Sequence, residues 1–159
     1  MAWVFIPAEW RPMLPMDWSW NIVSTDRCEC GTNEVVQDSS GLNANGNTVN
    51  GTVNGPARIC NGAIMNGTNF IRIPDNNDID LTDELTVTAW INLTSLGTEL
   101  KSILSKDENY EFHINNTGAI TGGGTAMPAR AHSRRARRAF DSQWEHVAIV
   151  YRNGRQSIF

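Results

Sequence analysis

The chain has 159 residues, enough for a single domain with a sizeable core. Hydrophobic residues make up 40% of it and charged residues 19%, a balance that is typical of a globular protein and argues against disorder. The net charge of −4 gives no reason to expect nucleic-acid binding, and no apolar run approaches the ~20 residues that a membrane-spanning helix needs.

Residues 1–30 contain four tryptophans and three prolines, all of them before Thr25. Proline recurs too often there for a helix or a strand. The apolar run from Ala2 to Ile6 is too short for a signal peptide and has no basic region before it. We therefore predict an irregular segment or linker over residues 1–30, which either joins a larger parent protein or is the tail of an upstream region.

The three cysteines are Cys28, Cys30 and Cys60. The first two are too close for a C-x-x-C metal site, and no second pair or histidine pair follows. We predict a disulfide between Cys30 and Cys60, because secreted and cell-envelope compartments let such bridges persist. The choice between Cys28 and Cys30 stays open, and the alternative is three reduced thiols.

Strand patterns begin after a run of Asn-Gly steps between Gly41 and Gly55, which predicts turns and short edge strands. Phe70 to Ile73 alternates and ends at Pro74, and the polar run Asp75–Asp80 predicts a turn. The strongest signal follows in Leu85–Leu93, where every second residue is apolar. This strict period of two predicts a β-strand with one buried face. We interpret Trp90, although it lies on the other face, and Trp144 as core residues.

Two more alternating segments follow, Ser102–Lys106 and Tyr110–Ile114, and they predict a meander. Residues 122–141 then form a basic excursion of helix-favouring composition. Five of the 13 basic side chains lie in it, Arg130, Arg134, Arg135, Arg137 and Arg138. We interpret the excursion as a solvated, partly helical loop, or as a patch that binds acidic polysaccharide, since guanidinium groups match sulfate and carboxylate geometry.

Four segments together resemble the laminin-G-like, concanavalin A-like lectin/glucanase jelly roll. They are VQDSSGLN (Val36–Asn43), FIRIP (Phe70–Pro74), LTDELTVTAW (Leu81–Trp90) and QWEHVAIVY (Gln143–Tyr151). The resemblance implies an all-β fold, an antiparallel jelly-roll sandwich over residues 31–159. Within the family, the Asn-rich part and the ARIC segment at Ala57 are most similar to the lectin-like domain of pilus biogenesis proteins of the mannose-sensitive haemagglutinin type.

Family members continue past the turn at Asn153-Gly154 with further strands that close the sandwich. We therefore expect this chain to be a fragment, incomplete at its C-terminus, with an exposed sheet edge. The family also makes calcium a candidate metal, with Asp75, Asn77 and Asp80 as ligands. The EF-hand spacing fails for these residues, and turn chemistry explains them without an ion, so we predict no metal or other cofactor as the first reading.

Catalysis is not expected from the residues. Glucanases of this fold carry an E-x-D-x-E triplet that projects paired carboxylates from one strand, and the chain has none. His113 and His146 have no nucleophile beside them in the sequence. The resemblance thus implies a non-catalytic lectin-like recognition or adhesion module of a cell-envelope, pilus-biogenesis or other extracellular protein, which binds glycan or a protein partner. A glucanase-like carbohydrate-active enzyme and a ligand-free spacer domain are the alternatives.

Overall fold

The computed structural model describes residues 2–5, 35–38, 43–51, 53–58, 61–75, 77–80, 84–106, 109–124, 142–152 and 154–159. These residues form twelve strands and one short 3-10 helix, η1 (Asn77–Ile79). No helix among them is long and apolar enough to cross a membrane.

The largest sheet has six antiparallel strands. Its order from edge to edge is β12 (Arg155–Ile158), β11 (Trp144–Arg152), β7 (Glu84–Leu93), β1 (Ala2–Phe5), β5 (Asn61–Met65) and β4 (Val53–Pro56). The long central pair, β7 with β11, runs in unbroken register from Glu84 opposite Arg152 to Asn92 opposite Trp144. This pair forms the frame on which the rest of the sheet is built.

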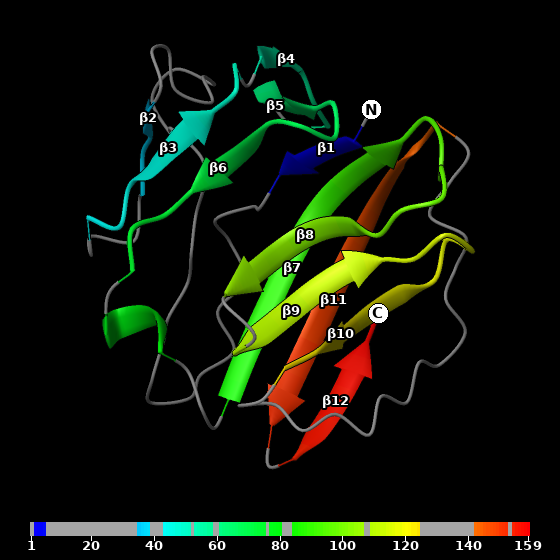
Figure 1. Cartoon of the computed structure of the whole chain (residues 1–159). Helices are drawn as coiled ribbons and strands as arrows, with labels where there is room; N and C mark the ends of the chain where they lie inside the picture. The colour runs from blue at the N-terminus through cyan, green and yellow to red at the C-terminus, as the bar shows by residue number, and fades with distance from the viewer. Residues whose placement is uncertain are drawn as a thin grey trace.

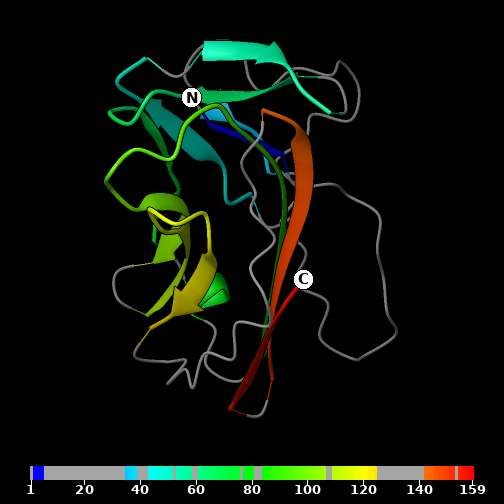
Figure 2. The same ribbon diagram turned by 90° about the vertical axis from the view of Figure 1, so that its right-hand side faces the viewer.

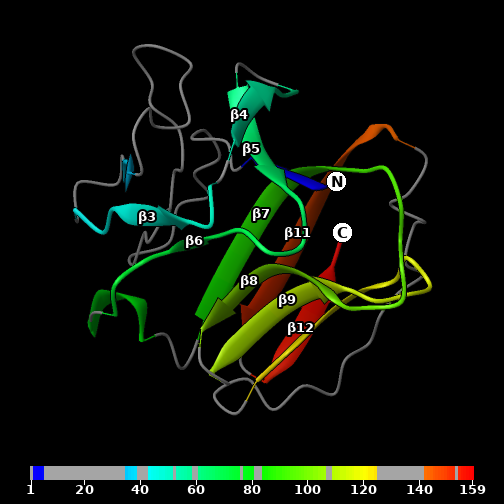
Figure 3. The same cartoon turned by 45° about the horizontal axis from the view of Figure 1, so that its top comes forward.

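Two smaller sheets complete the molecule. One has the order β10 (Ile120–Gly123), β9 (Tyr110–Ile114) and β8 (Lys101–Lys106), and the other has β2 (Val35–Val36), β3 (Gly46–Val49) and β6 (Phe70–Arg72). Figure 1 shows β8, β9 and β10 crossing in front of β7 and β11, and the turned view of Figure 2 shows the two sheets as separate layers. The sheet of β2, β3 and β6 lies on the side of the molecule away from β12 (Figure 3). The predicted antiparallel sandwich is confirmed.

The core fills the space between the six-stranded sheet and the sheet of β8, β9 and β10. Every second residue of β7, from Val87 to Leu93, is buried, and Ala89 has no exposed surface. These side chains pack with Phe112 and Ile114 of β9 and with the buried face of β11. The alternation seen in the sequence is thus the cause of the layering, because a strand with a period of two presents one apolar face to a neighbouring sheet.

The N-terminal prediction is wrong for four residues. Ala2–Phe5 form β1, which lies in the interior of the large sheet between β5 and β7. The frequency of proline misled the prediction, since the first proline comes only at Pro7 and leaves room for a four-residue strand before it. The basic excursion also begins later than residue 122, because Gly122 and Gly123 belong to β10.

Asparagine-centred turns hold the strands in place. Asn115 Oδ1 accepts hydrogen bonds from the amides of Thr117 and Ala119, both at 2.9 Å, and so closes the β9–β10 turn. In the turn of the predicted VQDSSGLN segment, Asp38 Oδ2 accepts a 3.0 Å hydrogen bond from the amide of Ala44, and Asn43 takes the left-handed conformation with φ 57°. Short polar side chains thus bond to the backbone of their own turns.

Candidate functional site

Trp90 lies on the outer face of β7, opposite the core. Its neighbours on that face are Thr88 and Asn92, and all three side chains are half-buried. The reading of Trp90 as a core residue is therefore wrong, because Ala89 and Ile91 point the other way and fill the interior. The same alternation that identifies the buried face puts Trp90 on the polar one, so the sequence did carry this signal.

His146 contacts Trp90 from the next strand. The β7–β11 register pairs the two residues directly, their ring centroids are 5.1 Å apart, and the ring planes are inclined at 53°. His146 is exposed, and Trp144, two residues before it on the same face, is half-buried. Trp144 is thus also outside the core. Directly opposed aromatic residues stabilise an antiparallel pair by about 0.2–1 kcal/mol, so the contact has a structural role whatever else it does.

Arg58 reaches Trp90 from the other side of β7. It follows β4, and in the sheet order β1, β5 and β4 lie on the side of β7 away from β11. Its Cζ atom lies over the Trp90 ring, 5.4 Å from the centroid, within the range of a cation–π interaction. The guanidinium is exposed, and no carboxylate of the described residues lies within 4.0 Å of it. We call Arg58, Trp90 and His146 the Trp90 cluster.

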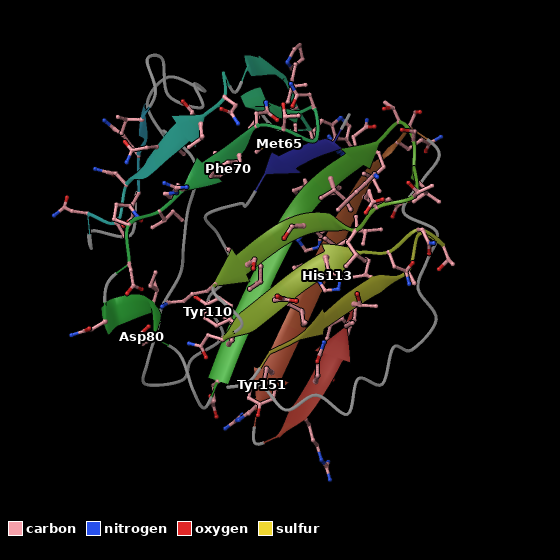
Figure 4. All side chains as sticks on the ribbon, in the orientation of Figure 1. Met65, Phe70, Asp80, Tyr110, His113 and Tyr151 are labelled. Atoms are coloured by element: carbon pink, nitrogen blue, oxygen red, sulfur yellow. The ribbon has the colours of Figure 1, made fainter. Side chains whose placement is uncertain are left out.

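Lys106 forms a second polar centre at the end of β8. Its Nζ lies 2.8 Å from Asp75 Oδ1 and 2.5 Å from Asp80 Oδ1, and its side chain is only 15% exposed. The hydrogen bonds to Asp75 and then Asp80 raise the pKa of the ammonium group above its usual 10.5. Beside it, the Tyr110 hydroxyl donates to the carbonyl of Ile79 at 3.0 Å, and burial raises the pKa of that hydroxyl. Figure 4 shows Asp80 and Tyr110 near one another at this end of the molecule.

This arrangement does not fit a calcium ion at Asp75, Asn77 and Asp80. Two of the three candidate ligands already bind the ammonium group of Lys106, and a divalent cation beside it would be repelled. Within the described part of the chain, no three His, Cys, Asp or Glu side chains are placed to hold a metal ion. In this loop the ammonium group of Lys106 supplies the positive charge that the carboxylates would otherwise take from a metal ion.

Glu111 and His113 share the outer face of β9. His113 Nδ1 lies 3.8 Å from Glu111 Oε2, and the register places Ser102 and Thr121 on either side of His113. Figure 4 shows His113 on β9, the middle strand of the small sheet. The contact is too long for a hydrogen bond, and no hydroxyl among the described residues donates to the imidazole ring. We regard this pair as a surface feature.

The remaining predicted sites fall outside the described residues. They comprise the proposed disulfide, Cys30 with Cys60, and the proposed polyanion patch, Arg130, Arg134, Arg135, Arg137 and Arg138. Both stay predictions. Residues that sequence reasoning missed are Arg58 and His146, and no local pattern marks Arg58, because only the sheet order brings it to Trp90.

Comparison with known proteins agrees with the architecture. Residues 65–159 match the family model described as the concanavalin A-like lectin/glucanases superfamily, a range that includes β7, β11 and both Trp90 and His146. No curated protein and no solved structure matches the chain. The finer likeness to pilus biogenesis proteins stays a prediction.

Proposed function

Because the chain belongs to the concanavalin A-like lectin/glucanase superfamily, we propose that it is a non-catalytic recognition module that binds glycan through the Trp90 cluster. The observation that supports this proposal is the convergence of Arg58, Trp90 and His146, from three separate parts of the sheet, on the face that the core does not use. Binding sites for small polar ligands typically combine aromatic surface with a few placed polar groups.

The chemistry of the cluster suits a sugar. The indole of Trp90 supplies apolar surface, while the exposed guanidinium of Arg58 supplies several hydrogen-bond donors. The hydroxyl of Thr88 lies on the same face of β7, whereas the amide nitrogen of Asn92 donates to the carbonyl of Ser142 at 3.3 Å. Hydrogen-bond donors beside an aromatic side chain suit the hydroxyl groups of a sugar.

We propose binding without catalysis because the chain lacks the alternating carboxylate triplet of the glucanases. We also propose that the domain works without calcium, since Lys106 already pairs with Asp75 and Asp80. As a recognition module it would act at the cell envelope or outside the cell, as part of a surface, adhesion or pilus-biogenesis protein. Its partner there would be a glycan, and a protein partner is the alternative.

A glycan array tests the proposal. The 159-residue chain should bind a defined subset of glycans, and Trp90→Ala should abolish that binding. Phe70→Ala is a matched control, because Phe70 is also a strand aromatic residue with an arginine, Arg72, over its ring at 5.4 Å. The control should bind as the wild type does.

The outcomes separate the alternative functions. No binding by the folded wild-type chain would favour a spacer domain, and binding that survives Trp90→Ala would place the site elsewhere. Release of reducing ends from a bound polysaccharide would indicate a carbohydrate-active enzyme. Trp90→Ala also removes a cross-strand contact, so circular dichroism should confirm that this variant retains its strand content.

A further inference from the structure

We infer that the ligand of the Trp90 cluster is an anionic glycan, one that carries carboxylate or sulfate groups and is held by the guanidinium of Arg58. This inference rests on the proposed function and names the class of sugar. Its starting point is charge: the chain as a whole is acidic, at −4, whereas the described residues on the outer face of the large sheet carry more positive than negative charge.

The register gives the charges on this face. Glu84 and Arg152 stand opposite each other at the end of β7 and β11 that is remote from Trp90, and Arg155 is opposite Arg152. Arg152 Nε and Glu84 Oε1 are 2.8 Å apart, so these two charges cancel. The charges left over on this face, among the described residues, are those of Arg58 and Arg155, both positive.

Arg58 is the better placed of the two to bind an anion. Its guanidinium lies over an aromatic ring, and this contact holds the side chain in place while leaving the donor groups free to pair with a ligand. A carboxylate or sulfate accepts two parallel hydrogen bonds from such a fork, and charge-assisted bonds of this kind are stronger than neutral ones. Pre-positioning reduces the entropy that binding would otherwise cost.

The position of Arg58 also reduces the ring surface of Trp90 that a ligand can reach. With a guanidinium over its ring on one side of β7 and His146 in contact from the other strand, Trp90 has less free ring surface for a stacked neutral sugar. The groups turned to solvent are the guanidinium and the imidazole, both exposed. A ligand with a negative charge gains from the positive guanidinium of Arg58, whereas a neutral sugar gains only hydrogen bonds.

The test measures binding of the 159-residue chain to polygalacturonate, heparin and dextran, which carry carboxylate, sulfate and no charge respectively. We expect one or both polyanions to bind more tightly than dextran, and the affinity to fall as salt rises. Arg58→Gln should weaken polyanion binding about tenfold or more, as the loss of a charge-assisted pair predicts. Arg58→Lys should recover only part of it, because the ammonium group lacks the planar fork.

Two controls separate a local contact from a change in net charge. Arg155→Gln removes the same charge from the same face, about 20 Å away along the strands, and Arg72→Gln removes an arginine that lies over a different ring. Both should bind as the wild type does. Equal losses in all three variants, or no loss in Arg58→Gln, would overturn the inference.

Failure of this inference is distinguishable from failure of the proposed function. Binding of neutral glycans that is lost in Trp90→Ala, without any preference for polyanions, would support a recognition module and refute the anionic ligand. Polyanion binding that is lost only when the five arginines between 130 and 138 become alanine would refute the role of Arg58. No binding of any probe by the folded chain would refute both.

Discussion

Lys106 and Arg58 are two cations of one chain in opposite circumstances. The ammonium of Lys106 lies against two carboxylates, Asp75 and Asp80, and its side chain is largely shielded from water. The guanidinium of Arg58 is exposed, lies over an indole ring, and has no carboxylate within 4.0 Å among the described residues. Lys106 is paired with carboxylates inside the fold, whereas Arg58 has no carboxylate partner among the described residues.

The difference indicates how to separate structural charges from functional ones. Lys106 joins the end of β8 to the loop around η1, so its loss should affect stability. Arg58 joins nothing by an ion pair in the described residues, so its loss should affect binding alone. The predictions that follow test this division, beginning with the largest expected change in stability.

Replacement of Lys106 by methionine should lower the free energy of unfolding by about 1–2 kcal/mol, because two carboxylates then face each other without a counter-ion. The value is below that of a deeply buried pair, since the side chain of Asp75 is 83% exposed and that of Asp80 is 49% exposed. Urea denaturation measures it. A double-mutant cycle with Asp80→Asn should show coupling, and strict additivity of the two changes would contradict the ion-pair role.

Stability should fall as the pH rises above about 10. The pKa values of Lys106 and Tyr110 are both raised in the folded chain, above 10.5 and 10.0 respectively. The unfolded chain therefore releases these protons first, so the stabilisation is complete below pH 10 and is lost as the pH climbs toward the folded values. Denaturation midpoints across this range should drop less steeply in Lys106→Met, and an identical slope would argue against a contribution from Lys106.

Calcium should distinguish the wild type from the Lys106 variant. The melting temperature of the wild type should not change on addition of calcium or chelator, because the ammonium group holds the two carboxylates. In Lys106→Met the same carboxylates become weak oxygen ligands, and millimolar calcium should stabilise the variant by about 1 kcal/mol or less. A melting temperature of the wild type that falls with chelator would show that a metal binds after all.

The smallest effects on stability should come from the exposed arginines. Arg58→Gln and Arg152→Gln should each change the free energy of unfolding by no more than about 0.5 kcal/mol, although Arg152 has an ion pair with Glu84. Thermal melts of both variants measure this. A large loss in Arg58→Gln would mean that its contact with Trp90 is mainly structural, and would weaken the case for a ligand there.

The alternation of β7 was fully readable in the sequence, and so was that of Tyr110–Ile114. Both segments have the buried face that the sequence predicts. Trp90 was misread because its hydrophobicity outweighed its position in the alternation, and Ala2–Phe5 because nearby prolines suggested a broken chain. For Trp90 the position in the alternation predicted the correct face, and the hydrophobic character of the residue did not. For Ala2–Phe5 the absence of proline within the four residues was a better guide than the prolines that follow.

What the sequence by itself determined is the sandwich, because a period of two commits each strand to one buried and one open face through contacts that are local in the chain. Only the tertiary structure decided which polar groups meet. Lys106 reaches carboxylates 26 and 31 positions away, and Arg58 and His146 reach Trp90 from opposite sides of β7. Such contacts depend on sheet order and register, which no short stretch of sequence encodes.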